Sequence, residues 1–274
     1  MEDKRRPHKL SYSDIDLARW KEYDEILTDS LWLLKSRKNT DGHKLDYHGN
    51  FIPQIAEQMM LRYTKEDDIV VDWFLGSGTS AIEAVNLKRR LIGVELKPDL
   101  VEYVRGKLPE HALDGRIKLI QGDSTTSKAR QAVASALAGM GASGGQAQLA
   151  ILHPPYHDII RFSRRKADLS NCPSCEEFLR KFARVASNAY EALEPGRFSV
   201  LVIGDKYANG KLNPLGFKCM QVMNDAGFST RSIIVKNIEG NEIAKGKNNN
   251  LWRYRALAGG FHVFRHEYVM VFCK

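Results

Sequence analysis

The chain has little cysteine and no long apolar run. Four cysteines in 274 residues fit a reducing compartment better than a disulfide-stabilised secreted fold. No stretch reaches the roughly 20 consecutive apolar residues that a membrane-spanning helix needs. The first residues, 1–7, are mostly charged and lack the apolar centre of a secretory signal. These absences argue against a secreted or membrane-embedded protein, and we expect a cytoplasmic one.

The sequence is also poor in metal-ligand patterns. Two cysteines form a lone C-x-x-C pair, Cys172-Pro-Ser-Cys175. A structural metal site needs further ligands at matching spacing, and no second pair accompanies this one. Neither the ligand set of a metal-dependent nuclease nor an internal repeat is evident. We therefore interpret the pair as two thiols in a loop and expect no metal site.

What the chain has in excess is positive charge. Its net charge of +8 and pI near 9.2 favour a polyanionic partner. One basic group comprises Arg161, Arg164, Arg165 and Lys166. A second region, 231–255, interleaves basic residues with Trp252 and Tyr254; its basic residues are Arg231, Lys236, Lys245, Lys247, Arg253 and Arg255. Cations beside rings that stack on bases are typical of a nucleic-acid interface. A solvated loop with some core aromatics is the alternative.

Short apolar segments alternate with helix-like segments through most of the chain. Strands are expected at 69–74, 91–95, 117–121, 148–152, 198–203, 230–235 and 267–273, and helices at 80–88, from 98 onward, 175–193 and 215–226. This order predicts an α/β domain with a mainly parallel sheet covered by helices on both faces. Apolar positions near helical spacing predict a helical N-terminal extension over 1–45, followed by a single domain over 46–274. Residues 139–145 and 238–250 are expected to be loops.

The segment Asp72-Trp-Phe-Leu-Gly-Ser-Gly-Thr79 closes the first of these strands and opens a helix. Its glycines, Gly76 and Gly78, let the backbone approach a ligand closely, and the helix start offers free N–H groups. Glu95 ends the next strand, where a carboxylate can accept both ribose hydroxyls. Asp123 ends the third, placed to accept from an adenine amino group. Because all follow parallel strands, one rim should carry them, which predicts a nucleoside site.

The segment His153-Pro-Pro-Tyr156 follows the fourth strand at the same rim. Two prolines remove two donors and give a stiff corner. Neutral His153 and the Pro154 carbonyl can accept hydrogen bonds from an exocyclic amine, which would direct the nitrogen lone pair at an electrophilic methyl group. Tyr156 can stack on the ring that carries the amine and hold it out of a duplex. Together the two segments indicate methyl transfer to an amine.

The two segments together resemble the amino-group DNA methyltransferases, which modify adenine N6 or cytosine N4. The resemblance rests on Phe74-Leu-Gly-Ser-Gly-Thr79 and His153-Pro-Pro-Tyr156, and further segments at 49–53, 91–95, 194–197 and 266–274 are similar to family segments. It implies a Rossmann-like methyltransferase with a seven-stranded-type sheet and S-adenosylmethionine as cofactor. It also implies double-stranded DNA as partner, with a flipped base, in DNA methylation of the restriction–modification kind. A bacterial protein would be nucleoid-associated.

The resemblance assigns roles to three groups of residues. The implied catalytic residues are His153, Pro154, Pro155 and Tyr156. The implied cofactor-binding residues are Phe51, Asp72, Phe74, Gly76, Ser77, Gly78, Thr79, Glu95 and Asp123. Nucleic-acid contacts are expected from Arg161, Arg164, Arg165, Lys166, Lys245, Lys247, Trp252, Arg253 and Arg255. We expect no large separate target-recognition domain and no fused nuclease.

His153 departs from the family pattern, which has Asp, Asn or Ser there. A protonated imidazole accepts no hydrogen bond, so activity is expected to fall through the usual histidine range, about pH 6 to 7. The departure also weakens the distinction between adenine and cytosine, with adenine slightly favoured. An RNA base, a protein glutamine amide, or a catalytically silent nucleic-acid-binding module of the same fold remain alternatives.

Overall fold

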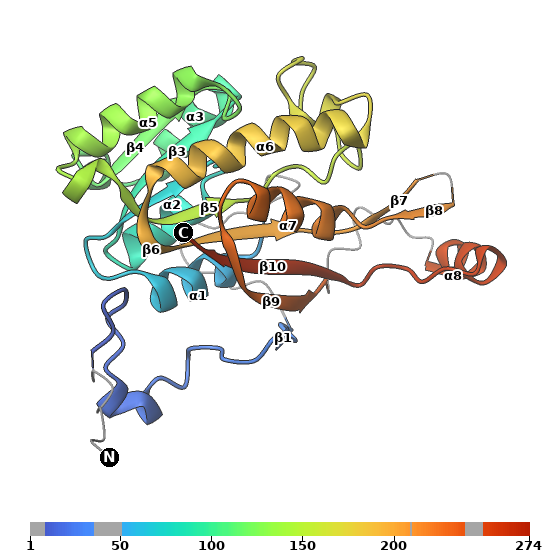
Figure 1. Ribbon diagram of the computed structural model, residues 1–274, viewed down its shortest axis with the longest axis horizontal. Coiled ribbons are helices and arrows are strands. Elements are labelled where there is room, and N and C mark those ends of the chain that lie inside the picture. The colour runs from blue at the N-terminus through green and yellow to red at the C-terminus, as the bar shows by residue number, and fades with distance from the viewer. Residues whose placement is uncertain (1–8, 36–50, 209, 239–248) are drawn as a thin grey trace.

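A twisted eight-stranded sheet forms the centre of the molecule (Figure 1). The computed structural model describes residues 9–35, 51–208, 210–238 and 249–274. The strands run in the order β1-β9-β10-β6-β5-β2-β3-β4. Their bounds are β1 Leu31–Trp32, β2 Ile69–Asp72, β3 Arg90–Glu95, β4 Ile117–Gln121, β5 Ala147–Leu152, β6 Leu193–Ile203, β9 Ser229–Asn237 and β10 His266–Cys273. A separate hairpin pairs β7 Lys206–Ala208 with β8 Lys211–Asn213.

Within the described residues of the eight-stranded sheet, parallel pairing dominates, and β10 alone runs against its neighbours. The strand order reverses between β2 and β5, which pair side by side although β3 and β4 intervene in the chain. This reversal is the point at which doubly wound sheets bind ligands, beyond the carboxyl ends of their strands. The Rossmann-like α/β sheet is confirmed, and β1 adds an eighth strand to the seven expected.

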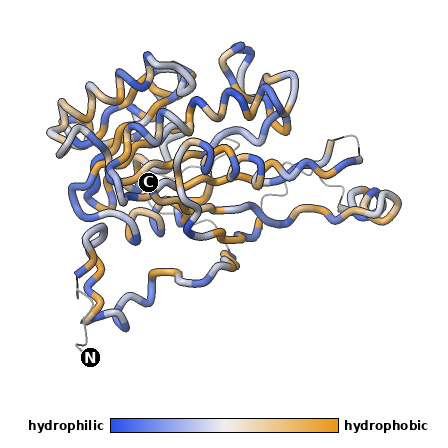
Figure 2. Tube along the Cα trace, viewed as in Figure 1, coloured by the Kyte–Doolittle hydropathy of each residue, from blue (hydrophilic) through white to orange (hydrophobic). Residues whose placement is uncertain are grey.

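Helices cover both faces of the sheet. Their bounds are α1 Pro53–Tyr63, α2 Thr79–Asn86, α3 Pro98–Lys107, α4 Glu110–Leu113, α5 Ser127–Gly139, α6 Cys175–Ala192, α7 Leu215–Asp225 and α8 Asn249–Gly259, with short 3-10 helices at Leu17–Glu22, Ser143–Gly145 and Leu169–Asn171. Successive strand residues point to opposite faces, so Val71 packs with α5, α6 and α7 while Val70 packs with α1, α2 and α3. Figure 2 shows hydrophobic residues concentrated along the central strands.

The N-terminal segment differs from the expected helical extension. Within residues 9–35, only Leu17–Glu22 form a helix, a 3-10 one, and Leu31–Trp32 pair with β9 as strand β1. The expectation of a mostly helical extension is therefore wrong for these residues, and 1–8 and 36–45 lie outside the described residues. Contacts to the body override the helical spacing: the Gln58 side chain accepts from Leu27 N at 2.7 Å and donates to Glu25 O at 2.8 Å.

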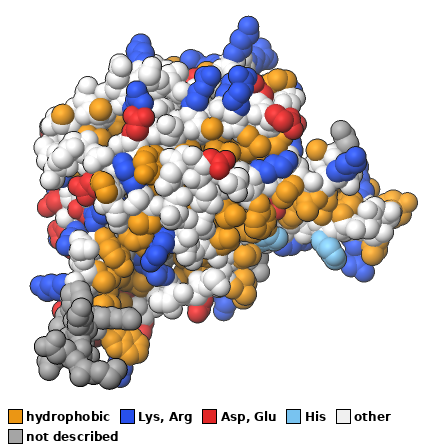
Figure 3. Space-filling view, in the orientation of Figure 1, with side chains coloured by type: hydrophobic (Ala, Val, Ile, Leu, Met, Phe, Trp, Pro, Cys, Tyr) orange, Lys and Arg blue, Asp and Glu red, His pale blue; other side chains and the backbone are white. Residues whose placement is uncertain are grey.

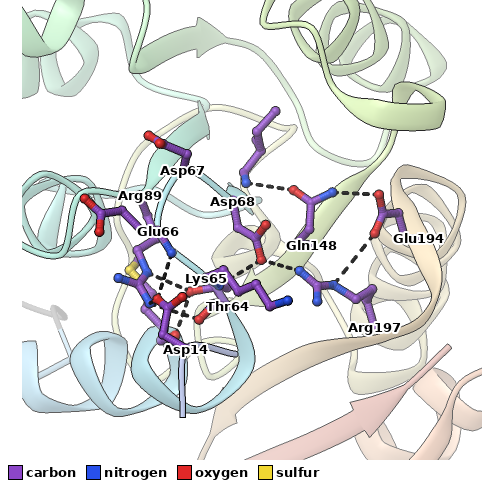
Figure 4. A network of polar contacts seen from close by, with 12 residues as sticks. Asp14, Thr64, Lys65, Glu66, Asp67, Asp68, Arg89, Gln148, Glu194 and Arg197 are labelled. Atoms are coloured by element: carbon purple, nitrogen blue, oxygen red, sulfur yellow. Dashed lines mark hydrogen bonds and ion pairs between the residues drawn. The ribbon is translucent and has the colours of Figure 1, made fainter. Parts of the chain in front are cut away.

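A polar network ties this segment to the amino ends of the parallel strands, at the other end of the sheet from the predicted site (Figure 4). The buried Arg89 guanidinium donates to Asp14 Oδ2 and to Thr64 O, both at 2.9 Å. Nearby, Arg197 forms an ion pair with Asp68. Because these charged groups sit at the amino ends of the strands, the carboxyl ends stay clear for the site.

Candidate active site

The glycine turn is stabilised from within by Asp72. This carboxylate is buried, and it accepts hydrogen bonds from Phe74 N at 2.9 Å and from the Ser80 hydroxyl. Burial raises the pKa of Asp72 to about 6, against the effect of these two donors. Sequence reasoning placed Asp72 among the cofactor contacts, whereas the structure shows both carboxylate oxygens engaged in the turn between β2 and α2.

Both glycines of the turn adopt left-handed backbone angles, with φ of 56° at Gly76 and 84° at Gly78. Residues that carry a Cβ atom rarely adopt such angles, whereas glycine adopts them readily. At Gly78 a side chain is also excluded by packing, because a Cβ there would lie 2.8 Å from Val104 Cγ1 on α3. Ser77 and Thr79 are buried beside the glycines, and Phe74 is half-buried. The turn therefore has a fixed shape that depends on both glycines.

Glu95 lies against the glycine turn. Its carboxylate accepts from Gly76 N at 2.9 Å through one oxygen and from Lys97 N at 2.8 Å through the other. Burial raises the pKa of Glu95 to about 7, although the two backbone donors oppose this. Each carboxylate oxygen has two acceptor positions, so each oxygen of Glu95 can accept one more hydrogen bond.

Asp123 lies just past β4 at the same rim. Its Oδ1 accepts from Thr125 N at 2.9 Å, and its carbonyl accepts from Thr126 N at 3.0 Å, which shapes the turn into α5. The next residue, Ser124, donates from its hydroxyl to Trp73 O at 2.6 Å and so ties this turn to the end of β2. The sheet thus gathers Glu95, Asp123 and the glycine turn at one rim, as the strand pattern predicts.

His153 is half-buried between two aromatic rings. The ring centroid of Phe51 lies 5.1 Å away and that of Tyr156 5.8 Å away. Burial lowers the pKa of His153 to about 4, although Glu267 acts in the opposite direction. The expected titration between pH 6 and 7 is therefore wrong: His153 is neutral throughout that range and able to accept a hydrogen bond. Phe51, predicted from its segment as a cofactor contact, packs directly on this side chain.

The hydroxyl of Tyr156 is held by a buried ion pair that sequence reasoning missed. It donates to Glu267 Oε2 at 2.7 Å, and Glu267 Oε1 accepts from Lys236 Nζ at 2.8 Å. Although burial opposes it, the Lys236 ammonium holds the pKa of Glu267 below its ordinary value. Across the ring, a Cβ at Gly204 would lie 2.9 Å from Tyr156 Cε2. The tyrosine ring is therefore fixed at its edge and at its hydroxyl.

Lys236 is one of the basic residues counted in the 231–255 region, but it does not add to a basic surface there. The side chain is buried, because β9 directs it toward Glu267 on the neighbouring strand β10. A charged residue in each of two adjacent apolar strands is the signal that would have revealed the pair, since buried charges need a partner.

A second cluster fixes the chain just after the corner. The buried His157 has a positive φ of 55°. Its Nδ1 accepts from Lys206 Nζ at 2.9 Å, which leaves Nε2 to donate to Cys172 O at 2.9 Å. The same lysine forms an ion pair with Asp158. Through its hydrogen bond with His157, Cys172, the first cysteine of the C-x-x-C pair, has a structural role. The described residues contain no group of ligands that suits a metal ion.

The predicted nucleic-acid residues fall into two groups that lie on different elements. Arg161, Arg164, Arg165 and Lys166 line a hollow in the loop between the corner and α6. Arg253, Arg255 and Trp252 lie on α8, which projects from the body at the far right of Figure 1. The Arg255 guanidinium lies 5.3 Å from the Trp252 ring. Lys245 and Lys247 lie outside the described residues. No helix of the described part has the length and apolar character to cross a membrane.

Residues 2–105 match the model of a family described as DNA methylase. The type II methyltransferase M.MjaII of Methanocaldococcus jannaschii is 30% identical over 95 residues, which cover 32% of this chain and 18% of that protein. M2.LlaDCHI of Lactococcus lactis subsp. cremoris is 30% identical over 117 residues, or 41% of this chain and 40% of that protein. The match therefore spans less than half of either relative. A methyltransferase structure from Pyrococcus furiosus has a TM-score of 0.49 and 13% identity, over 84% of this chain and 87% of that one.

Proposed function

On the premise that the chain is a member of the amino-group DNA methyltransferase family, as its DNA methylase match supports, we propose that it methylates an exocyclic amine of a DNA base. The observation that carries this is the shared rim: the glycine turn, Glu95 and the corner all follow carboxyl ends of adjacent parallel strands. A nucleoside-binding turn next to a stiff amine-accepting corner fits this reaction.

The residues at the rim fit S-adenosylmethionine as the methyl donor. The turn provides two glycines with left-handed backbone angles and the free N–H groups at the N-terminus of α2, and Glu95 and Asp123 provide carboxylate acceptors. We propose that Glu95 accepts from the ribose hydroxyls and Asp123 from the adenine amino group. Asp72 holds the turn in shape, and Phe51, whose ring packs on His153, would contact the methionine end of the cofactor. When bound, the cofactor supplies an electrophilic methyl group.

The corner would orient the acceptor amine. An amine conjugated to an aromatic ring is a poor nucleophile, since its lone pair is delocalised into the ring. Neutral His153 and the Pro154 carbonyl accept hydrogen bonds from the two N–H groups of the amine, which turns the nitrogen lone pair toward the methyl group. Pro155 keeps the corner rigid. The low pKa of His153 keeps the acceptor nitrogen unprotonated at neutral pH. Tyr156 provides the stacking ring for a base rotated out of the duplex.

Residues 46–274 would then act as one catalytic unit. Within it, contacts to the nucleic acid fall to the loop after the corner and to the segment around α8, including Lys245 and Lys247. Adenine N6 is the first target to test and cytosine N4 the second.

Transfer of a tritiated methyl group to DNA, RNA and bulk protein tests the proposal. We expect label in DNA, and none with the Tyr156→Ala variant, which should still bind S-adenosylmethionine by calorimetry. Glu95→Ala is the matched variant that should lose cofactor binding itself. Label only in RNA or in protein would assign the acceptor to those classes. An unlabelled wild type together with labelled DNA from His153→Asp would identify a catalytically silent binding module.

A further inference from the structure

A basic hollow lies in the loop between the Pro-Pro corner and α6. Its volume is ≈ 750 Å³, and its lining includes Arg161, Arg164, Arg165, Lys166, Asn171 and Lys181. Five of these six side chains are cationic, and no acidic residue is among the lining. Lys181 comes from α6 and was not singled out by the sequence patterns. Figure 3 shows Lys and Arg side chains gathered over this part of the surface, where the loop rises above α6 in Figure 1.

The cations of the hollow form no ion pair within the described part of the chain. The nearby acids have other direct partners: Asp158 pairs with Lys206, Glu177 pairs with Arg180, and Asp168 accepts hydrogen bonds within the loop. Glu177 also attracts Lys181, though not as a close ion pair. Grouped cations without partners repel one another, so an anion entering the hollow relieves that repulsion.

The loop that presents these cations is ordered by its own hydrogen bonds. The buried Asp168 accepts from the Ser163 hydroxyl at 2.7 Å, and through its other oxygen from Ser170 N at 2.8 Å and the Ser170 hydroxyl at 2.6 Å. The Asn171 amide donates to Ser163 O at 2.8 Å and to Arg165 O at 2.9 Å. An ordered loop loses less conformational entropy when it binds a ligand, which favours binding.

The loop is attached to the rest of the domain at its middle and at its start. Lys181 Nζ donates to Lys166 O at 3.1 Å and so attaches the middle of the loop to α6. At the start of the loop, His157 and Asp158 are bonded to Lys206, directly after the corner residue Tyr156. The hollow is therefore held at a fixed place relative to the corner.

We propose that this hollow binds the phosphate backbone of nucleic acid beside the base held at the corner. The inference rests on the proposed function for the identity of the polymer. Five cations spread over a hollow of this size suit successive phosphates along a strand better than a single phosphate ion. Contacts of this kind position the substrate without reading its sequence.

Fluorescence anisotropy of a labelled short DNA duplex, measured over a series of salt concentrations, tests the proposal. Each phosphate contact contributes about 0.9 to the slope of log affinity against log salt, and roughly five- to tenfold in affinity near 0.1 M salt. The Arg164→Gln/Lys166→Gln variant should lower the slope by about 2 and the affinity by roughly 30-fold. The matched control is Arg105→Gln/Lys107→Gln, which removes the same charge from the end of α3 remote from the rim and should change the slope little.

A third variant separates the shape of the hollow from its charge. Asp168→Ala removes a negative charge, so general attraction to DNA should increase, whereas loss of the ordered loop should weaken binding. We expect a fall in affinity of roughly tenfold, with circular dichroism confirming that the chain stays folded. Equal slopes for wild type and the Arg164/Lys166 variant, or tighter binding by Asp168→Ala, would overturn the proposal. These outcomes do not depend on methyl transfer, so failure of the proposed catalysis would be seen separately.

Discussion

The ion pair behind Tyr156 makes a sharp prediction about stability. Lys236 and Glu267 are 7% and 11% exposed in their side chains, and their charged atoms lie 2.8 Å apart. Glu267→Gln keeps the shape but only one acceptor oxygen, so Tyr156 and Lys236 cannot both keep their acceptor, and the Lys236 ammonium is left buried beside a neutral group. Removing one partner of a buried pair costs about 3–5 kcal/mol, and the one hydrogen bond that the glutamine oxygen retains favours the lower value, about 3 kcal/mol. At about 2 °C per kcal/mol for a chain of this size, the melting temperature should fall by about 6 °C.

Urea denaturation and thermal melting of a double-mutant cycle measure this effect. Adding Lys236→Met to Glu267→Gln removes the stranded charge, and we expect recovery to within about 1 kcal/mol of the wild type. Glu177→Gln, at an exposed ion pair on α6, is the control and should leave the transition unchanged. If Glu267→Gln costs less than about 1 kcal/mol, or if the double variant is no more stable than the single one, the buried-pair argument is refuted.

Three further predictions concern the rim. Gly78→Ala should lower the free energy of unfolding in urea by about 2–4 kcal/mol, because φ is +84° and Val104 blocks the new methyl group. The control is Gly106→Ala, whose new methyl group meets no atom within 4 Å and should not destabilise the chain. Equal free energies of unfolding for the two variants would contradict this. Burial raises the pKa of Glu95 to about 7, and under the proposed function it is the carboxylate form that binds ribose. Calorimetric affinity for S-adenosylmethionine should therefore fall up to about tenfold per unit as pH drops below 7, and a constant affinity from pH 8 to 5.5 would exclude that role. At saturating cofactor, His153 should impose no change in rate from pH 5.5 to 8, and a decline near pH 6.5 that vanishes in His153→Asn would show that the ring titrates there.

Most of the sheet follows from local apolar runs. The five residues of β4, Ile117–Gln121, are those expected, and the bounds of β3, β5 and α6 agree within a residue or two. The rim follows as well, since parallel strands bring their carboxyl ends together whatever else the chain does. Glycines and acids that end strands are therefore readable from sequence.

Elements with a weak apolar signal were not predicted. The helix α5 buries only Ala129, Val133 and Leu137. Only the first two residues of α8 fall in the expected loop 238–250, and no helix was expected after that loop. The N-terminal segment has helical spacing, but its partners, such as Gln58, come from distant parts of the chain. The same reason hid the Lys236–Glu267 pair, because its members meet only through the pairing of β9 with β10. A local pattern can show that a charge within an apolar strand needs a partner, but it does not show which residue that partner is.

The short strand β1 has a consequence for how the chain behaves in solution. Leu31 and Trp32 pair with Val235 and Lys236 on the outer side of β9, and Asn237 holds Leu34 by accepting from its N–H at 2.8 Å and donating to its carbonyl at 3.1 Å. Without β1, the end of β9 next to Lys236 would present unpaired backbone groups, which recruit strands from other molecules. A shortened chain that begins after residue 35 should therefore self-associate more readily, which size-exclusion chromatography would show, even though the glycine turn and the corner are still present. The first part of the chain would in this way help to decide whether the protein stays monodisperse.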